Sequence, residues 1–329
     1  MAKRKALARP GRSTPQLRGW WRRVVVTGGA GFIGSNLALE IERRYPNAEV
    51  VVVDDFRSGS FGNLRTFRGD VVAADVSRTD LEHVFGGRAP SSVFHLASIT
   101  DTTVSDASLM VHDNVEGFRR VLRCALALRL PLVYASSAAT YGVAGRRMSE
   151  ETPARPANVY AFSKMIMDNI ARRAIAGSPG ARITGLRYFN VYGPGEWHKK
   201  DAASMIYKLA RQILAGERPW VCAHGEHKRD FVYVKDVVEA TILAAESRRS
   251  GVYNVGSGRA RSFNEVIQIL NRELGGRRET EYVENPYAFY QPFTEADLSA
   301  CAAALGYAPR WGLEEGIRDY LSEIRAAAG

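Results

Sequence analysis

The chain has 329 residues, of which 46% are hydrophobic and 24% charged, a composition typical of a soluble globular protein with one large core or two closely joined domains. It contains no run of about 18 uncharged apolar residues, so the sequence excludes a spanning helix and we expect no membrane contact. Cys124, Cys222 and Cys301 are far apart and form no Cys-x-x-Cys pair, which indicates reduced thiols in a cytoplasm and argues against a disulfide framework or a metal site.

The first segment, residues 1–21, is strongly basic. Eight basic residues lie among the first 23 positions, which hold no acid, so the rest of the chain carries only +2 of the net charge of +10. With Pro10, Gly11 and Pro15, this composition predicts a disordered tail, and it lacks the apolar core of a signal peptide. Because the charge is confined to the tail, we expect no nucleic-acid partner, with RNA association through the tail as the alternative.

A glycine-rich turn follows the first predicted strand. Residues 24–26 are all Val and run into Thr-Gly-Gly-Ala-Gly-Phe-Ile-Gly (27–34), after which apolar residues recur with helical period. Glycines permit a tight turn and the close approach of a pyrophosphate, whose charge the free N–H groups at the helix start would meet. The sequence therefore predicts dinucleotide binding by Gly28, Gly31, Phe32, Ile33 and Gly34.

A second β-branched run, residues 50–53, ends in Asp54, at the spacing expected for an acid that binds a ribose of the dinucleotide. Asp54 suits the free 2′-hydroxyl of NAD, whereas Arg57, just beyond Asp55, suits the 2′-phosphate of NADP. We assign all three residues to the cofactor, and at this point they leave the choice between NAD and NADP open.

Short β-branched runs continue to alternate with longer helical patterns, which indicates a parallel sheet covered on both faces. The run 71–74 precedes an acid, residues 92–98 form a strand and its exit loop, and a helix is predicted over 109–128. His95, within that strand, is expected to be a core residue. The residues assigned to the cofactor along this stretch are Asp75, Leu96, Ala97, Ser98 and Asn114.

The next predicted strand, 131–135, leads to Ser137. A serine here commonly caps a turn, but ligands gather outside the carboxyl ends of parallel strands, where its hydroxyl could bind a substrate oxygen. Tyr160 and Lys164 follow on one face of a predicted helix. Because a fixed positive charge favours a phenolate, the pair is a candidate base, and Ser137, Tyr160 and Lys164 are the first predicted catalytic residues.

Taken with the glycine loop, these three residues resemble the extended short-chain dehydrogenase/reductase family, which modifies nucleotide sugars by hydride transfer to and from a tightly held nicotinamide. The resemblance covers nearly everything after the tail. It implies that Lys164 also contacts the nicotinamide ribose. Family dehydratases usually carry Thr-Asp-Glu where this chain has Ser137-Ala138-Ala139, and the missing acid pair favours an epimerase.

The second half narrows the resemblance. Residues 186–200 (LRYFNVYGPGEWHKK), 228–234 and 290–298 are similar to the epimerases of this family that act at C6″ of an ADP-linked heptose with NADP. Such enzymes are thought to use two bases, because hydride leaves one face of C6″ and returns to the other. The resemblance makes Lys199 the second catalytic residue, although a solvated side chain beside Lys200 is the alternative.

The resemblance also implies the remaining contacts. Val191 and Lys199 lie on the cofactor side of the pocket, and Arg229 would bind the ADP diphosphate in bidentate fashion unless it pairs locally with Asp230. The residues expected to contact the substrate are Ser137, Asn190, Asp201, Lys208, Arg229 and Tyr290.

We predict an α/β fold with a Rossmann-type doubly wound parallel sheet over 22–190 and a smaller, α-rich substrate-binding region over 191–329, of which 231–256 return to the main body. The predicted function is conversion of ADP-D-glycero-D-manno-heptose to the L-glycero form for lipopolysaccharide, with NADP (NAD as the alternative), in the cytoplasm and as a homo-oligomer. The alternatives are a UDP-hexose 4-epimerase and, in another class, a non-catalytic dinucleotide-binding sensor or scaffold.

Overall fold

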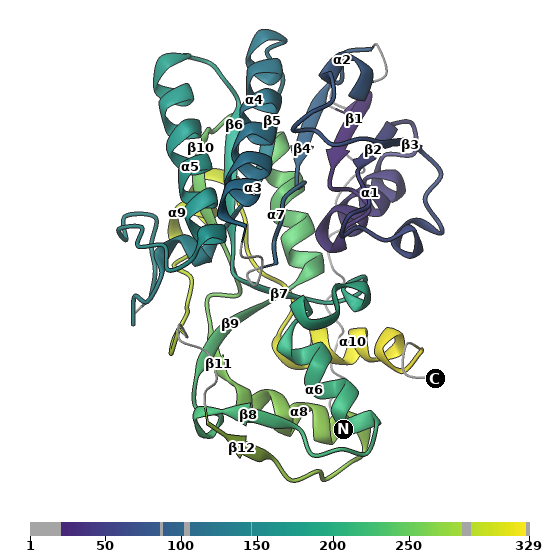
Figure 1. Cartoon of the computed structure of the whole chain (residues 1–329), viewed down its shortest axis with the longest axis vertical. Helices are drawn as coiled ribbons and strands as arrows, with labels where there is room; N and C mark the ends of the chain where they lie inside the picture. Colours follow the sequence, from purple (N-terminus) through teal and green to yellow (C-terminus); the bar gives the residue numbers. More distant parts are fainter. Residues whose placement is uncertain (1–20, 86–87, 102–105, 146, 285–290, 327–329) are drawn as a thin grey trace, which may run out of the picture.

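The main body is built on a sheet of seven parallel strands (Figure 1). The computed structural model describes residues 21–85, 88–101, 106–145, 147–284 and 291–326. The strand order is β10-β6-β5-β4-β1-β2-β3, so the order reverses between β1 and β4. The strands are β1 (Arg23–Thr27), β2 (Glu49–Asp54), β3 (Asp70–Ala73), β4 (Ser92–His95), β5 (Leu132–Ser137), β6 (Ile183–Tyr188) and β10 (Gly251–Val255). The predicted Rossmann-type fold is confirmed.

Helices cover both faces of this sheet, which explains why its strands read as continuous Val-rich runs. Val24 and Val26 pack in the core shared with α1 and α7, whereas Val25 packs in the core shared with α4 and α5. The helices of the main body are α1 (Phe32–Arg44), α2 (Leu81–Val84), α3 (Ala107–Val111), α4 (Gly117–Ala127), α5 (Val159–Gly177) and α7 (Val234–Glu246), and α9 (Ser299–Leu305) lies against β10.

A smaller region lies below the sheet in Figure 1. It contains a three-stranded sheet of β11 (Ala260–Ser262), β9 (Lys228–Tyr233) and β7 (Asn190–Tyr192), and a pair formed by β12 (Glu281–Val283) and β8 (Trp220–Cys222). Its helices are α6 (Met205–Leu214), α8 (Phe263–Leu274) and α10 (Leu313–Ala326). Of the segment 231–256, α7 and β10 belong to the main body, whereas β9 belongs to the smaller sheet.

The helix predicted over 109–128 is not uniform. It consists of α3 and α4 joined by a π-helical turn, η3 (His112–Glu116). Such wide turns are rare in helices and often occur at functional sites. This turn carries Asp113 and Asn114, both buried.

The N-terminal boundary of the main body includes Trp21. This residue, the last of the predicted tail, is buried and its ring stacks on Tyr45 with centroids 4.2 Å apart. Residues 1–20 lie outside the described residues, so the disordered tail stays a prediction. None of the helices in the described ranges is both long enough and apolar enough to cross a membrane.

Candidate active site

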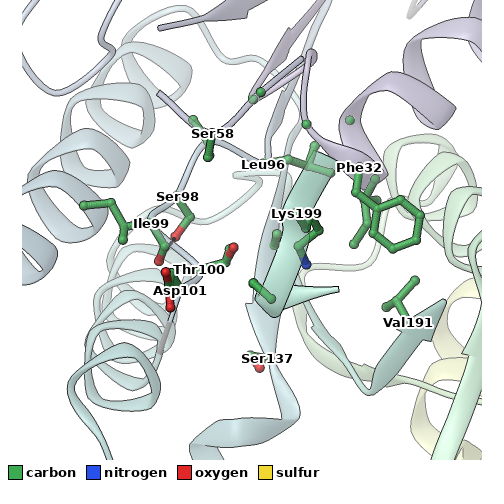
Figure 2. A pocket seen from close by; sticks show the side chains of 18 of the residues that line it. Phe32, Ser58, Leu96, Ser98, Ile99, Thr100, Asp101, Ser137, Val191 and Lys199 are labelled. Carbon is green, nitrogen blue, oxygen red and sulfur yellow. Dashed lines mark hydrogen bonds between the residues drawn. The ribbon is translucent and has the colours of Figure 1, made fainter. Parts of the chain in front are cut away.

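A cleft of about 920 Å³ lies at the carboxyl ends of the central strands, between the main body and the smaller region (Figure 2). Among the predicted site residues, those that line it are Gly28, Gly31, Phe32, Ile33, Gly34, Asp54, Asp55, Arg57, Asp75, Leu96, Ala97, Ser98, Asn114, Ser137, Tyr160, Lys164, Asn190, Val191, Lys199 and Arg229. The fold thus brings nearly all of them together.

Three predicted substrate residues are not placed in the cleft. Lys208 lies on α6, of which Met205 in the first turn lines the cleft, so the structure does not place Lys208 in the lining and its substrate contact stays a prediction. Tyr290 and the side chain of Asp201 lie outside the described part of the chain, and their contacts stay predictions.

The glycine loop packs closely against β2 and the residues that follow β4. Gly28 has a φ of +71°, and a Cβ there would lie 2.5 Å from the backbone nitrogen of Ala97. A Cβ on Gly34 would lie 2.1 Å from the carbonyl oxygen of Gly28. The loop leads into α1 at Phe32, whose first-turn N–H groups have no helical acceptor. Glycine at these positions therefore allows the compact loop that presents the free N–H groups, which suit a phosphate.

Asp54 supports this loop. Its two carboxylate oxygens accept hydrogen bonds from the backbone N–H groups of Ala30 and Phe56, each at 2.9 Å. Burial raises the pKa of Asp54, and these two bonds oppose the shift. Each oxygen keeps a second lone pair that can accept a hydrogen bond from a ribose hydroxyl, and this predicted contact stays a prediction. The two bonds to the loop already fix the position of the Asp54 carboxylate.

Ser137 and Tyr160 meet where β5 ends and α5 begins. The Ser137 Oγ accepts a hydrogen bond from the Ala139 N–H at 3.2 Å, so this serine caps a turn and also lines the cleft. Asn158 caps α5 by accepting from the Ala161 N–H at 2.8 Å, which sets the first turn that carries Tyr160. Burial raises the pKa of Tyr160, and a hydrogen bond with Ser137 opposes the shift.

Lys164 lies one turn further along α5. Its Nζ is 5.8 Å from the centroid of the Tyr160 ring and donates a hydrogen bond to the Ala135 carbonyl oxygen at 2.8 Å. Burial lowers the pKa of Lys164 to about 8, against the opposing charge of Asp168. Burial thus keeps the pKa of Tyr160 above its usual value in this structure, and the role of Lys164 in favouring the phenolate stays a prediction.

Asn114 holds the wall of the cleft in place. Its Oδ1 accepts from the Ile99 N–H at 2.8 Å, and its Nδ2 donates to the Ile99 carbonyl at 3.1 Å and to the Ser163 Oγ at 3.0 Å. The side chain is fully buried. Asn114 thus ties the loop after β4 to the residue next to Lys164, and its predicted cofactor contact is untested.

A buried ion pair lies behind Lys164. Asp168, one turn after Lys164, pairs with the Arg187 Nε at 2.8 Å and accepts from the Tyr134 hydroxyl at 2.9 Å. The guanidinium carbon of Arg187 lies 4.6 Å from the centroid of the Tyr141 ring. This network joins α5 to β5 and β6, and His95 nearby is a neutral core residue, since burial lowers its pKa to about 3.

Lys199 enters the cleft from a different element, η5 (Trp197–Ala202). Figure 2 shows Lys199, Phe32 and Val191 on one side of the view and Ser98, Thr100 and Asp101 on the other. The Lys199 Nζ lies 5.8 Å from the Phe32 ring centroid. Burial lowers the pKa of Lys199, while the charges of Glu196 and Asp101 oppose the shift, so this amine is not an ordinary solvated lysine.

Glu196 closes the loop that carries Lys199. Its buried carboxylate accepts from the Ser204 N–H at 2.5 Å, the Ser204 Oγ at 2.8 Å and the Gly193 N–H at 3.2 Å. The two ends of the loop therefore share one acceptor. On the outer side, the Glu323 carboxylate of α10 accepts from the Gly195 N–H at 2.7 Å.

The smaller region contributes polar groups to the same cleft. Asn190 is exposed at the start of β7, and its Oδ1 accepts from the Thr294 Oγ1 at 3.2 Å. Arg229 is buried with its guanidinium carbon 5.7 Å from the Phe263 ring centroid. The Asp230 carboxylate accepts from the backbone N–H groups of Ser257, Gly258 and Ala296 and from the Ser257 hydroxyl. The structure thus gives Asp230 a role in loop anchoring.

The sequence did not point to Asp101, Asp113, Glu196 or Arg78. Asp113 directly precedes Asn114, and Glu196 lies three residues before Lys199, so closeness to predicted residues was the only available signal. Within the described ranges, no group of three or more His, Cys, Asp or Glu side chains could hold a metal ion.

Comparison with known proteins adds three findings. A family model described as the NAD dependent epimerase/dehydratase family matches residues 24–256. The ADP-L-glycero-D-manno-heptose-6-epimerase of Alkalilimnicola ehrlichii is 38% identical over 322 residues, covering 92% of this chain and 98% of that protein. The crystal structure of the Helicobacter pylori ADP-L-glycero-D-manno-heptose-6-epimerase has a TM-score of 0.87 at 38% identity, covering 94% of this chain and 98% of that one. The UDP-glucose 4-epimerase of Thermotoga maritima, solved with UDP-glucose, has a TM-score of 0.86 at 27% identity, covering 93% and 100%.

Proposed function

The chain belongs to the NAD dependent epimerase/dehydratase family, and from this premise we propose that it converts ADP-D-glycero-D-manno-heptose to ADP-L-glycero-D-manno-heptose by inverting C6″. The observation that carries the proposal is 38% identity, over nearly the whole chain, to an epimerase of that name, combined with Ser137, Tyr160, Lys164 and Lys199 lining one cleft. The resemblance inferred from the sequence is confirmed at the level of the family. The product would supply heptose for lipopolysaccharide.

A nicotinamide dinucleotide fits the residues present. At Gly28 and Gly34 any Cβ would collide with backbone atoms of the protein, so the loop can close in this way only with glycine, and the first turn of α1 presents free N–H groups beside it. When bound, a nicotinamide would supply reversible hydride transfer at C6″, so the net reaction would involve no oxidation.

Tyr160 is the first acid/base in this proposal. It takes the proton of the C6″ hydroxyl as the hydride leaves, and Ser137 holds the same oxygen through its hydroxyl. The ammonium of Lys164 favours the phenolate electrostatically. Because burial works against ionisation of Tyr160 in the protein alone, the charge of Lys164 is needed and must be retained.

Lys199 is the second acid/base. After the hydride has left, the ketone must present its other face, and its oxygen then lies away from Tyr160. Lys199 comes from the loop after β7, whereas Tyr160 comes from α5, so the two approach the cleft from different elements. Its lowered pKa makes the neutral amine, which can take up a proton, more accessible than in a solvated lysine.

The ADP portion is assigned to the smaller region. Arg229, buried beside Phe263, supplies a planar guanidinium suited to the diphosphate, and Asn190 supplies an amide for the sugar. The assignments of Arg229 and Asn190 rest on the resemblance and on the lining of the cleft, and that of Tyr290 to the nucleotide end rests on the resemblance alone.

The setting of the reaction is also part of the proposal. We place it in a cytoplasm, which agrees with three free cysteines, two of them buried. A homo-oligomer is supported by Phe61 and Trp197, which are 73% and 41% exposed; Phe61 adjoins Gly62 in the chain, and the Trp197 ring lies against Gly62. Sedimentation equilibrium of the full chain tests this, and a monomer at micromolar concentration would contradict it.

Product analysis tests the reaction. The full chain is incubated separately with ADP-D-glycero-D-manno-heptose and with UDP-galactose, and the sugar protons are followed by NMR. We expect inversion at C6″ of the heptose and no reaction of UDP-galactose. Turnover of UDP-galactose alone would identify a UDP-hexose 4-epimerase instead, and absence of both reactions in a protein that binds dinucleotide would favour the sensor or scaffold.

A further inference from the structure

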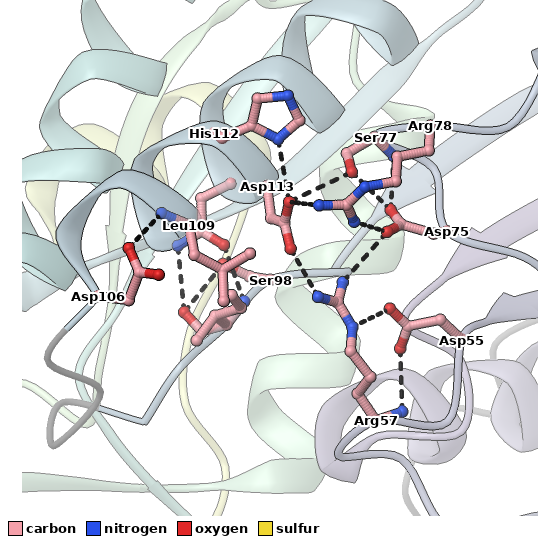
Figure 3. Close-up of polar contacts among 12 residues, drawn as sticks. Asp55, Arg57, Asp75, Ser77, Arg78, Ser98, Asp106, Leu109, His112 and Asp113 are labelled. Atoms are coloured by element: carbon pink, nitrogen blue, oxygen red, sulfur yellow. Dashed lines mark hydrogen bonds and ion pairs between the residues drawn. The ribbon is translucent and has the colours of Figure 1, made fainter.

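A cluster of five charged residues, four of which line the cleft, lies beyond the glycine loop (Figure 3). We call it the 2′ cluster, and it consists of Asp55, Arg57, Asp75, Arg78 and Asp113. Arg57 lies at its centre, with its Nε 2.5 Å from Asp55, one terminal nitrogen 2.6 Å from Asp113 and the other 3.5 Å from Asp75. Arg78 pairs with Asp75 and, at 3.0 Å, with Asp113.

The position of the cluster relates it to one end of the cofactor. In a doubly wound sheet, the pyrophosphate lies at the first glycine turn, and the adenosine ribose lies at the end of the second strand. Asp55 and Arg57 directly follow β2, and Asp75 follows β3, the neighbouring strand. The cluster therefore surrounds the place where NADP carries a 2′-phosphate and NAD a hydroxyl.

The net charge of the 2′ cluster decides whether it accepts the 2′-phosphate of NADP or the 2′-hydroxyl of NAD. Three carboxylates and two guanidinium groups leave a formal charge of −1 before any ligand binds. A 2′-phosphate would add further negative charge among these carboxylates, whereas a hydroxyl can donate to one of them. Each nitrogen of Arg57 already donates to one of Asp55, Asp75 and Asp113, and Arg78 donates to Asp75 and Asp113, so a phosphate would compete with these carboxylates for both guanidinium groups.

Asp113 is the residue of the cluster that most strongly opposes the release of Arg57 to a phosphate. Its carboxylate is only 4% exposed, whereas the Arg57 and Arg78 side chains are 47% and 52% exposed. The π-helical turn η3 projects it between the two arginines, and His112 lies 3.0 Å from it. A phosphate that drew Arg57 toward itself would weaken the pairing of Arg57 with this buried carboxylate, which would remain beside the phosphate with less counter-charge.

The ionisation of Asp113 agrees with this geometry. Burial alone would raise its pKa, but hydrogen bonds from Arg57 and His112 and the charges of both arginines lower it below the usual value. The carboxylate is therefore negatively charged at neutral pH, the state in which it repels a phosphate.

We propose that this chain binds NAD in preference to NADP and that Asp113 is the residue that sets the preference. The inference rests on the nicotinamide cofactor of the proposed function and not on its sugar substrate. It replaces the NADP expectation drawn from the resemblance, in which Arg57 was considered without its three carboxylate partners.

Binding of two redox-inactive probes tests the proposal. Calorimetric titration of the full chain with ADP-ribose and with its 2′-phosphate measures the ratio of the two Kd values without any sugar or turnover. We expect ADP-ribose to bind at least about tenfold more tightly. The Asp113→Asn substitution keeps the size of the side chain and removes its charge. We expect it to lower the ratio of the Kd of the 2′-phosphate to the Kd of ADP-ribose by about tenfold, mainly through tighter binding of the 2′-phosphate.

A matched control separates the local charge from the overall charge. Asp106→Asn makes the same substitution at an exposed position at the start of α3, where Asn caps as well as Asp. It should leave the ratio unchanged. If Asp113→Asn melts at assay temperature, Asp55→Asn, with a partly exposed carboxylate, makes the same test. Equal or tighter binding of the 2′-phosphate by the wild type overturns the proposal, and so does a ratio unaffected by both variants. Failure of the heptose reaction would leave this result unchanged.

Discussion

At the scale of single residues, the candidate site contains two amines and a phenol whose pKa values burial moves away from the usual ones. Burial raises the pKa of Tyr160 and lowers those of Lys164 and Lys199. The three shifts all favour the uncharged forms, so charge must come from contacts between the groups and from the ligand. Tyr160 and Lys164 were predictable because four residues of one helix place them together.

Replacing Tyr160 by Phe tests the phenol directly. Tyr160→Phe keeps the ring and removes the group that exchanges the proton, so we expect kcat to fall by about 100-fold or more. Steady-state kinetics with the ADP-heptose measures this. Tyr282→Phe removes a hydroxyl from a half-exposed ring outside the cleft and should keep the wild-type rate. Wild-type kcat in Tyr160→Phe would contradict the assignment.

The pH dependence of kcat reports on Lys164. A lysine is charged below its pKa, so the ammonium that favours the Tyr160 phenolate is lost as pH rises through about 8. We expect the plot of log kcat against pH to bend downward near that value. In Lys164→Arg the charge persists at higher pH, and the bend should be absent from whatever activity remains. A bend that is the same in both proteins would assign it to another group.

At the scale of elements, the glycine loop and α5 could be predicted because their signals are local. The strand-turn-helix spacing of residues 24–44 and the Asn158 cap need no distant partner. Glu196 and Asp113 could not be predicted in this way. Glu196 works by joining Gly193 to Ser204, and Asp113 meets Arg57 only because β2 and the helix after β4 share one edge of the sheet.

The close packing of the glycine loop predicts that one added methyl group weakens dinucleotide binding. In Gly34→Ala the new Cβ would lie 2.1 Å from the Gly28 carbonyl oxygen, so the loop must shift and we expect dinucleotide Kd to rise by about tenfold. Gly177→Ala, at the end of α5 with no atom within 4 Å of the new Cβ, is the matched control. Equal dinucleotide affinity in the two variants, measured by calorimetry, would show that the loop does not hold the dinucleotide.

At the scale of the whole molecule, the main body and the smaller region meet at a cleft that neither could form alone. The body supplies Tyr160 and Lys164, and the smaller region and its connecting loop supply Lys199 and Arg229. The sequence predicted this division only coarsely, because α7 and β10 follow β9 in the chain yet belong to the body. Their place depends on strand order, which no local pattern encodes.

The buried network of Asp168 holds three elements of the body together. Asp168→Asn leaves Arg187, only 1% exposed, without its counter-charge, and we expect the free energy of unfolding to fall by about 3–5 kcal/mol. Glu279→Gln breaks an exposed pair with Arg218 and should change it by less than about 1 kcal/mol. Urea denaturation measures both, and equal losses would mean that the buried pair contributes no more than the surface one.

The central claim is that C6″ is inverted with Tyr160 and Lys199 as two acid/base residues, and the rate of inversion in Lys199→Met tests it most directly. The variant keeps an unbranched side chain of similar length and removes the amine, and Lys235→Met on α7, outside the cleft, controls for loss of a lysine. NMR of ADP-D-glycero-D-manno-heptose should show inversion by the wild type and by Lys235→Met, and inversion slower by about 100-fold in Lys199→Met. Inversion by Lys199→Met at the wild-type rate would contradict the account.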